Sequence, residues 1–509
     1  MNAPKRLLRL SPADNVAVAL ESLTPGSEWQ TDDGLNVVVT QPVPAGHKIA
    51  LVDIAAGQPV RKYGQIIGIA SESVEAGAHV HVHNVLSEHG TLTHEIGSGY
   101  QPTPREPETA HFMGYVRQTG QVGTRNYIGV IASVNCSATV SKKIAEHFNA
   151  AALAGFPSVD GVVSITHGAG CGMGSTGEGI DILRRTLQGY ARHPNFVGVL
   201  VIGLGCEVNQ VARLVEQLPA RQAGLFSTLI IQDQGGTRES IAEGIARIEA
   251  MLPIANLAKR SPVPLSKLVI GLQCGGSDAY SGITANPVLG TAVDLLVQQG
   301  GTAILSETPE IYGAEHLLTS RAASQAVGDK LLSRIAWWEA YTRMHQGDMN
   351  NNPSPGNKAG GITTILEKSL GAVAKAGSTG LMAVYEYAEP VTTSGLVFMD
   401  SPGYDPVSAT GQVASGANLI CFTTGRGSTY GCKPVPSLKL ATNSTLFERM
   451  RLDMDFNAGD LLTGGLTLAQ AGQDLLALIL ATASGQPTMS EQNGLGDNEF
   501  VPWQLGAVM

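Results

Sequence analysis

Four cysteines stand at the ends of apolar runs of strand length, in the segments IASVNC, SITHGAGC, VIGLGC and VIGLQC. They are Cys136, Cys171, Cys206 and Cys274, and each lies beside Gly or Asn. In open parallel sheets, ligands bind beyond the carboxyl ends of the strands. Thiolates are soft metal ligands, so we predict that at least two of the four line an active site and bind metal. The alternative is that they are small buried side chains. An iron–sulfur cluster held by three of them is less favoured, because no local CxxC spacing supports it.

The segment HVHVHN places three imidazoles close together in the sequence. His79, His81 and His83 alternate with Val80 and Val82. On a strand, side chains alternate between faces, so the three rings would share one face. Neighbouring imidazoles bind divalent metals, and we take His81 and His83 as candidate metal ligands. The alternative is a solvated polar face.

A glycine-rich loop, HGAGCGMGSTGEG, follows the second strand of the predicted parallel sheet. Gly172, Gly174 and Gly177 formally match a dinucleotide fingerprint, but the acidic partner expected about 20 residues later is missing. A glycine-rich turn at a helix N-terminus binds any anion, so we favour a substrate carboxylate at Gly172 and Gly174 over NAD. His167, just before the loop, is a candidate acid or base, or else a packed histidine.

Three further loops combine Gly, Asn and Ser with one charge each: CGGSDAYSGITANP, NPSPGNKAGG and TTGRGSTYG. Arg426 can bind a carboxylate through two hydrogen bonds, and Lys358 can act as a base or stabilise an enolate. Singly, each side chain could be a turn residue. Together the loops predict an anionic, polyhydroxylated substrate, with Lys358 and Asp278 as catalytic candidates and with further binding residues at Ser277, Asn286, Asn357 and Arg426.

The residues around these loops predict an α/β multidomain chain. Short alternating runs separated by turns predict an all-β module over 1–96, and a stretch rich in Pro and Gly predicts a linker over 97–112. Apolar runs that alternate with amphipathic stretches then predict Rossmann-like parallel sheets with crossover helices. A break at 257–267 divides this part into domains over 113–260 and 261–509.

The composition of the chain argues against several classes of function. The chain has 509 residues, of which 15% are charged, and a net charge of −10, which argues against a nucleic-acid partner. No apolar run approaches the ~20 residues of a membrane span, and the N-terminus lacks a signal-peptide core. Six cysteines are too sparse for a disulfide scaffold and suit a reducing compartment, so we expect a cytoplasmic enzyme without a membrane partner.

The same loops resemble the altronate and galactarate dehydratases, a family of sugar-acid lyases. The similarity covers nearly the whole chain, through GHKIALVDI, HVHVHN, HPNFVGVLVIGLGCE, QCGGSDAYSGITANP, NPSPGNKAGG, FTTGRG and KLATN. The segments HVHVHN, GAEHLL and NKAGGITT look more like altronate dehydratases. The segments NYIGVIASVNCSATV and LQCGGSDAYSG lean toward galactarate dehydratases.

The resemblance implies an N-terminal β-clip (SAF-like) domain, dependence on Fe²⁺ or Mn²⁺, and loss of water from a hexonate such as D-altronate to give 2-keto-3-deoxygluconate. Removal of the proton α to a carboxylate creates an enediolate, which a metal and cationic side chains stabilise. His167 and Lys358 remain unranked as the base. Alternatives are galactarate dehydration, sulfo-lyase chemistry and, from another class, an NAD-dependent oxidoreductase or a non-catalytic sugar-acid binding protein. A homodimer is expected.

Overall fold

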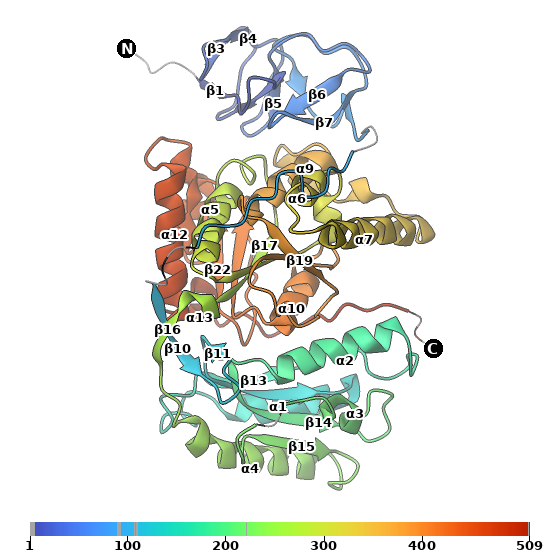
Figure 1. The fold of residues 1–509 in the computed structure, drawn as a ribbon, viewed down its shortest axis with the longest axis vertical. Helices are drawn as coiled ribbons and strands as arrows, with labels where there is room; N and C mark the ends of the chain where they lie inside the picture. The colour runs from blue at the N-terminus through green and yellow to red at the C-terminus, as the bar shows by residue number, and fades with distance from the viewer. Residues whose placement is uncertain are drawn as a thin grey trace.

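The computed structural model describes residues 6–88, 93–105, 107, 110–219, 221–506 and 508. Parts of the predicted first domain (1–5 and 89–92) and of the predicted linker (106, 108 and 109) lie outside the described residues. Three sheet-bearing units follow one another along the chain, and Figure 1 shows them stacked along the long axis, with the C-terminal unit in the middle. The chain therefore passes from the first unit to the far end of the molecule before it returns to the centre.

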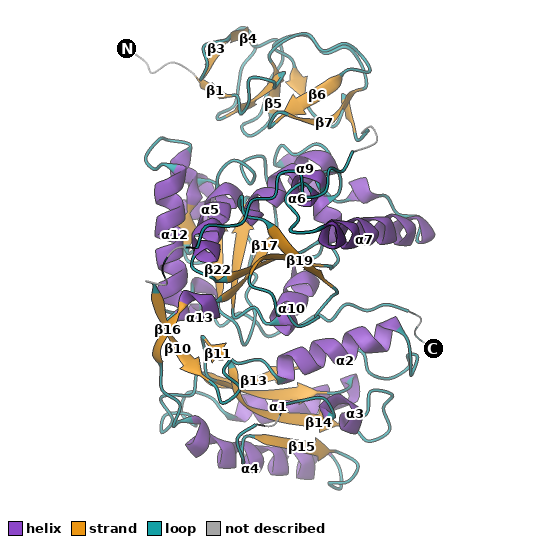
Figure 2. Cartoon of the chain, viewed as in Figure 1, coloured by secondary structure: helices purple, strands orange, loops and turns teal. Residues whose placement is uncertain are grey.

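The first unit is built from short strands and turns, as Figure 2 shows. A six-stranded sheet has the order β4-β3-β1-β2-β5-β8, and a three-stranded sheet has the order β6-β7-β9. Gly77 (φ 83°) lies against the backbone of Val38, where a side chain would collide with the Val38 carbonyl. The strands are Arg6–Leu8 (β1), Val16–Ala19 (β2), Glu28–Thr31 (β3), Asn36–Val38 (β4), Lys48–Ala50 (β5), Pro59–Lys62 (β6), Gln65–Ala70 (β7), His79–Val80 (β8) and Val85–Leu86 (β9).

One detail of this unit differs from the sequence expectation. The histidine segment was predicted to be a strand with three rings on one face, but β8 ends at Val80, and His81 to Asn84 form a turn. The Asn84 side chain stabilises this turn, because its Oδ1 accepts the His81 N–H and its Nδ2 donates to the His79 carbonyl, each at 2.9 Å. Local side-chain bonds of this kind compete with the strand ladder.

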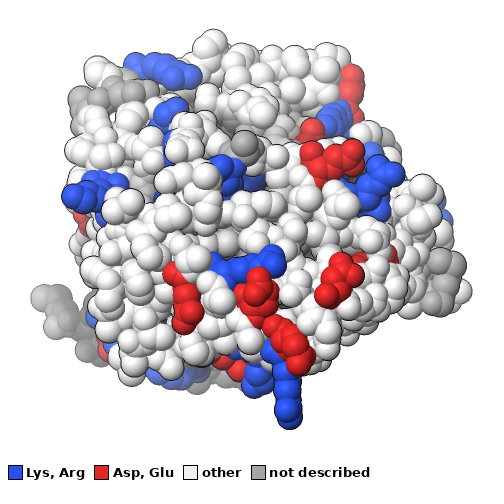
Figure 3. All heavy atoms as spheres, turned by 90° about the horizontal axis from the view of Figure 1, so that it is seen from below, with Lys and Arg blue, Asp and Glu red and all other residues white. Residues whose placement is uncertain are grey.

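The second unit has a parallel sheet with the order β13-β12-β14-β15. All eight residues of β14 are buried, as expected of a central parallel strand that is covered on both faces. The strands are Tyr127–Ala132 (β12), Gly161–Ile165 (β13), Phe196–Gly203 (β14) and Phe226–Ile230 (β15), and the helices are Asn135–Ser137 (η1), Ala138–His147 (α1), Glu178–Ala191 (α2), Val211–Val215 (α3) and Thr237–Ala255 (α4). Figure 3 views this end of the molecule, where acidic and basic groups are scattered among uncharged residues.

A small antiparallel sheet, β11-β10-β16, connects the second and third units. Its strands are His111–Val116 (β10), Val122–Gly123 (β11) and Ser261–Pro264 (β16). Strand β10 begins inside the predicted linker, and β16 lies inside the predicted break at 257–267. Before β10, the described residues 93–105 run along the third unit, where Gly97 and Gly99 donate backbone hydrogen bonds to Thr319 and Ser320 at 3.0 and 2.8 Å.

The third unit is a seven-stranded parallel sheet with the order β19-β20-β18-β17-β21-β22-β23. Its strands are Val269–Cys274 (β17), Thr302–Leu305 (β18), Leu381–Tyr385 (β19), Gly395–Met399 (β20), Leu419–Thr424 (β21), Ser437–Ala441 (β22) and Phe456–Asn457 (β23). The α-helices are Ala285–Gln298 (α5), His316–Thr319 (α6), Gln325–Met344 (α7), Pro355–Ala359 (α8), Ile365–Val373 (α9), Asp405–Ser415 (α10), Ser444–Arg449 (α11), Leu468–Ala483 (α12) and Met489–Gln492 (α13). Short 3₁₀ helices are Leu265–Lys267 (η2), Thr308–Ile311 (η3), Met349–Asn351 (η4), Ala374–Ala376 (η5) and Ala458–Leu461 (η6).

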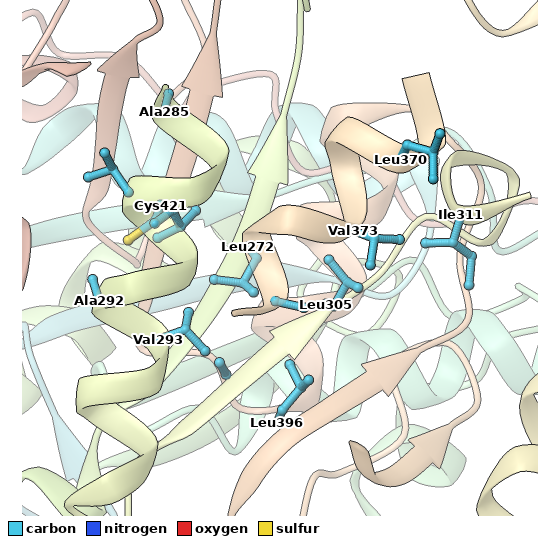
Figure 4. Close-up of a cluster of buried hydrophobic side chains, with 14 of the residues drawn as sticks. Leu272, Ala285, Ala292, Val293, Leu305, Ile311, Leu370, Val373, Leu396 and Cys421 are labelled. Carbon is cyan, nitrogen blue, oxygen red and sulfur yellow. The ribbon is translucent and has the colours of Figure 1, made fainter. Parts of the chain in front are cut away.

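The core of the third unit lies between this sheet and the helices α5 and α9. Figure 4 shows Ala292 and Val293 of α5 and Val373 of α9 facing Leu272, Leu305 and Leu396 of the central strands. This packing holds the strand ends, and therefore the loops that follow them, in fixed positions. The predicted architecture of an all-β domain followed by parallel α/β domains is confirmed. Among the described residues, no helix is long and apolar enough to cross a membrane.

We predict that Leu272→Ala destabilises the third unit strongly. Leu272 is completely buried, and truncation of a buried leucine costs about 2–5 kcal/mol of unfolding free energy through lost burial and a residual cavity. The shift of the denaturation midpoint, followed by circular dichroism, measures the effect. Leu257→Ala is the matched control, because Leu257 is 73% exposed and should change stability by no more than about 0.5 kcal/mol. Equal shifts for both variants would contradict this account of the core.

Candidate active site between the first and third units

Three histidines of the first unit gather where this unit meets the third. His47 precedes β5, and His79 lies in β8, the strand that pairs with β5. His47 Nδ1 lies 3.0 Å from His79 Nε2, and the ring of His81 lies 4.5 Å from that of His47, centroid to centroid. One possible ligand atom from each residue lies within 4.8 Å of the others. The cluster, which we call the histidine trio, therefore has the dimensions of a single-ion site.

The electrostatics of the histidine trio suit a metal ligand set. Burial lowers the pKa of His79 to about 4 and that of His81 to about 3, and the nearby cations and imidazoles reinforce both shifts. The rings are thus neutral near pH 7, which is the form that binds metal. His81 Nδ1 is buried without a hydrogen-bond partner among the described residues. A buried polar atom of this kind is costly unless something binds it, so the residues present fit a divalent cation.

The third unit approaches the histidine trio through the loop after α8. His47 Nε2 lies 3.3 Å from the Ala359 carbonyl oxygen. Gly361 (φ 98°) packs against the Gly46 carbonyl so closely that a side chain at 361 would overlap it. Lys358, half-buried, is the residue before Ala359. The predicted loop 352–361 is thus part of the contact between the units, beside the trio.

A buried charge triad fastens this contact. Lys48 and Lys62 of the first unit reach Glu367 of α9, with Nζ–O distances of 2.9 Å each, and all three side chains are at most 1% exposed. Glu367 Oε2 also accepts hydrogen bonds from the backbone and hydroxyl of Thr363, at 2.8 and 2.7 Å. Burial alone would raise the pKa of Glu367, but the two ammonium groups lower it well below its usual range. Burial lowers the pKa of Lys48 to about 8, despite its partner.

A second cluster of buried groups lies at the carboxyl ends of β17 and β18. Cys274 Sγ lies 3.1 Å from Glu310 Oε2, and Lys375 Nζ lies 2.9 Å from the same sulfur. Lys368 Nζ lies 2.6 Å from Glu310 Oε1. We call these residues, with Glu307, the acid–lysine cluster. One ligand atom each from Cys274, Glu307 and Glu310 lies within 4.8 Å of the others.

Glu307 is the unusual member of the acid–lysine cluster. It is completely buried, it has a positive φ of 71°, and neither carboxylate oxygen has a hydrogen-bond partner among the described residues. Burial and the neighbouring Glu310 raise its pKa well above the usual range, whereas Lys368 and Lys375 lower the pKa of Glu310 to about 2 against its burial. The pair therefore holds one protonated and one ionised carboxyl group, an arrangement that serves acid–base chemistry elsewhere.

A small cavity connects the charge triad to the acid–lysine cluster. Its lining includes Lys62 and Glu367 of the charge triad, Cys274 and Lys368 of the acid–lysine cluster, and Asp278. Asp278 accepts hydrogen bonds from Ser281, Thr442 and Asn443, at 3.0 to 3.1 Å, and burial raises its pKa despite them. It therefore connects the loop after β17 to the loop after β22.

Several predicted binding residues hold loops in place. Asn357 Nδ2 donates to the Ser277 carbonyl at 2.8 Å, which connects two of the predicted loops. Asn286 donates to the Gly371 carbonyl and accepts from the Thr423 hydroxyl, so both ends of its amide are used. Arg426 is exposed, and its backbone N–H bonds to the Gly276 carbonyl at 2.8 Å. The structure thus brings Ser277, Asp278, Asn357 and Lys358 together, with the Asn286 amide satisfied inside the protein and the Arg426 side chain at the surface.

The predicted metal ligands fall into three places. His81 is in the histidine trio, and the exposed His83 lies beside it, 5.2 Å from the His79 ring. Cys274 is in the acid–lysine cluster. The remaining three, Cys136, Cys171 and Cys206, are exposed free thiols of the second unit. The four cysteines therefore do not form one cluster, because they end strands of two different sheets.

His167 and the glycine-rich loop belong to the second unit. His167 Nε2 lies 3.1 Å from the Ala132 carbonyl, and its Nδ1 accepts the Ala169 N–H at 3.2 Å. With both ring nitrogens used, His167 connects strand ends and has no nitrogen free for a substrate proton. Gly172 and Gly174 lie in the loop before α2, whose first turn contains Glu178 and Asp181. Two carboxylates at this helix N-terminus repel an anion, which disfavours both the predicted substrate carboxylate and the NAD interpretation.

Comparison with known sequences places this chain in a family. Three family models match it in order: "Altronate/galactarate dehydratase SAF domain" over residues 5–88, "D-galactarate dehydratase/Altronate hydrolase, second domain" over 114–256, and "D-galactarate/Altronate dehydratase, C-terminal" over 265–508. An altronate dehydratase of Escherichia coli is 38% identical over 96% of this chain and 97% of its own length. The chain belongs to the altronate/galactarate dehydratase family. The resemblance seen in the sequence is thus confirmed.

Other relatives show the range of this family. An altronate dehydratase of Bacillus subtilis is 36% identical over 96% of this chain and 97% of its own length. A galactarate dehydratase (L-threo-forming) of Escherichia coli is 38% identical over 96% of this chain and 95% of its own length. A (2R)-sulfolactate sulfo-lyase subunit beta of Chromohalobacter salexigens is 33% identical over 77% of this chain and 97% of its own length. Identity alone therefore does not distinguish altronate from galactarate.

We predict that Glu367→Gln destabilises the protein by about 3–5 kcal/mol, because it leaves two buried ammonium groups without a carboxylate. Thermal unfolding measured by calorimetry tests this, and limited proteolysis should show the first unit released earlier. Glu249→Gln is the matched control, because Glu249 is exposed on α4. Unfolding of Glu367→Gln at the wild-type temperature would show that the triad does not hold the units together.

Proposed function

We propose that this chain is a sugar-acid hydro-lyase that removes water from a hexonate such as D-altronate to give 2-keto-3-deoxygluconate. Full-length similarity to altronate dehydratases supports the reaction class. The observation that carries the proposal is the histidine trio, which meets the Ala359 loop of the third unit at 3.3 Å. Loss of water needs a group that stabilises an enediolate and an expelled hydroxyl group, and such a site fits that need.

We infer that His47, His79 and His81 would hold the divalent ion. Imidazole suits iron, whereas manganese is better matched by carboxylate and water ligands, so Fe²⁺ is favoured over Mn²⁺. When bound, the ion would supply Lewis acidity toward the substrate carboxylate or hydroxyl group. The three rings would set its position, because His47 immediately precedes β5, His79 lies on the paired strand β8, and the His81 turn is held by Asn84.

Of the two bases that the sequence left unranked, Lys358 is favoured. It is half-buried, it immediately precedes the carbonyl that contacts His47, and no ion pair to it occurs in the described part of the chain. A lysine with no carboxylate partner in the described part of the chain, beside a metal site, can take part in the transfer of the α-proton or stabilise the enediolate as a cation. His167 is not suited to this role, because both of its ring nitrogens bond to the backbone.

Asp278 has a positioning role in this proposal. Its carboxylate binds loops that follow β17 and β22, and the Ala279 N–H donates to the Gly360 carbonyl at 2.9 Å. Asp278 would thus help to hold the 352–361 loop beside the histidine trio. The Arg426 side chain is exposed and would bind a carboxylate of the substrate.

Galactarate is the second candidate substrate, since a galactarate dehydratase is as similar as the altronate dehydratases. Both substrates carry an α-proton and a β-hydroxyl, so the same site serves either reaction. We also infer a cytoplasmic location, because all six cysteines are free thiols, and a homodimeric state.

We predict that an anaerobic assay with Fe²⁺ yields a 2-keto acid from D-altronate, and from no other member of a panel of galactarate, galactonate, gluconate and sulfolactate. A dinitrophenylhydrazine assay or coupled reduction of the product measures the keto acid. Turnover of galactarate alone would show that galactarate, and not D-altronate, is the substrate. No keto acid from any of the five compounds, with iron bound, would overturn the proposed reaction.

We predict that His81→Ala lowers turnover by at least about 100-fold and removes the divalent ion, because it deletes one of three ligands. Metal content measured by mass spectrometry after desalting gives a readout independent of activity. His147→Ala is the matched control, because His147 is exposed on α1 of the second unit. Wild-type iron content in His81→Ala would remove the histidine trio from the proposal.

A further inference from the structure

The second unit contains three cysteines that the proposed dehydratase site does not use. Cys136 lies in η1, just after β12, Cys171 lies in the loop after β13, and Cys206 lies in the loop after β14. These three strands are neighbours in the parallel sheet, with β12 in the centre. All three thiols therefore lie at one edge of one sheet, the edge at which ligands bind in open α/β folds.

The three loops are fastened together by hydrogen bonds. Asn135 donates its backbone N–H to the Ala169 carbonyl at 2.9 Å, which connects the loop of Cys136 to that of Cys171. Asn209 donates its backbone N–H to the Gly170 carbonyl at 3.0 Å and its side-chain amide to the Ser133 carbonyl at 2.9 Å. The loop of Cys206 is thus bound to both of the others. These bonds fix the relative positions of the three cysteines.

Exposure separates these thiols from the other cysteines. Cys136, Cys171 and Cys206 are exposed, whereas Cys274, Cys421 and Cys432 are buried. Free cysteine is among the most buried residue types, so three exposed thiols at one sheet edge require an explanation other than packing. Gln232 Nε2 donates a hydrogen bond to Cys206 Sγ at 3.5 Å. Amide donors of this kind commonly bond to the sulfur atoms of metal-bound cysteines.

The geometry excludes a preformed single-ion site. A tetrahedral ion needs its ligand atoms within about 4 Å of one another, because each metal–sulfur bond is about 2.3 Å. Among the described residues, the groups whose ligand atoms lie within 4.8 Å of one another include none of these three cysteines. An iron–sulfur cluster connects more widely spaced thiols, because inorganic sulfide bridges its irons.

We propose that Cys136, Cys171 and Cys206 bind a [4Fe–4S] cluster with three protein ligands. Such a cluster usually takes four cysteines, so one iron would have no protein ligand and would be open to solvent or to an oxygen ligand. The 167–177 loop, with positive φ at Gly170, Gly172 and Gly177, would surround it with backbone N–H groups. This site is separate from the histidine trio and does not depend on the proposed substrate.

The test is anaerobic reconstitution of the full-length protein with ferrous iron, sulfide and a thiol reductant, followed by desalting. We expect about four irons and about four acid-labile sulfides per chain beyond the ion at the histidine trio, with broad visible absorbance. Labile sulfide distinguishes the cluster site from the histidine trio, because the trio would bind an iron ion without sulfide. His81→Ala should therefore keep the sulfide, whatever happens to the proposed dehydratase activity.

Single substitutions identify the ligands. Cys136→Ser, Cys171→Ser and Cys206→Ser should each lose most of the labile sulfide and the visible absorbance, while thermal unfolding before reconstitution stays at the wild-type temperature because the side chains are exposed. Cys432→Ser is the matched control and should keep the cluster, since its sulfur lies 3.4 Å from the Ser437 hydroxyl and a hydroxyl can replace it. Absence of labile sulfide from the reconstituted wild type, or equal sulfide in the Cys→Ser variants, would overturn the proposal.

Discussion

The sharing of one buried carboxylate by two lysines is the interaction on which the site depends. Glu367 belongs to the third unit, whereas Lys48 and Lys62 belong to different sheets of the first. A buried ammonium group without its carboxylate is strongly unfavourable, so both sheets must face α9 in one orientation. Because Lys48 follows His47 directly, the same interaction sets the position of the histidine trio. The charge triad therefore fixes the orientation of the first unit on the third, in addition to stabilising their contact.

The acid–lysine cluster and the histidine trio provide two different chemical environments near the contact between the first and third units. The trio is made of neutral imidazoles, whereas the cluster holds two ammonium groups and a carboxyl pair in different protonation states. Burial opposes charge on the imidazoles and on Glu307, whereas the two lysines keep Glu310 ionised against its burial. Residues of both the first and third units line the cavity beside the cluster, so the units must be docked before this cavity is complete.

The sequence predicted the architecture well, because hydrophobic periodicity and turn residues are local signals. The runs that became β12, β14 and β17 were recognisable, as were the loops that contain Asp278 and Lys358. Two kinds of feature were missed. His47 gave no local signal, because it joins His79 only through the long-range pairing of β5 with β8. The Glu307 and Glu310 pair was missed because a buried charge is identified by its partners, which lie on α9 and η5. Cys274 was grouped with the other strand-end cysteines, since strands of two separate sheets have the same sequence pattern.

The small antiparallel sheet has a consequence for how the chain is assembled. His111 pairs with Pro264 and Gly114 pairs with Ser261, so the chain enters and leaves the second unit at neighbouring points. A unit whose ends lie side by side is topologically an insertion, which can be added to or removed from a host fold without stretching it. The first and third units then constitute the host, and the second unit is inserted into it through β10 and β16. The insertion also packs on its host, because one hydrophobic cluster contains Leu187 of α2 and Val413 of α10, so the two packed faces must change together in evolution.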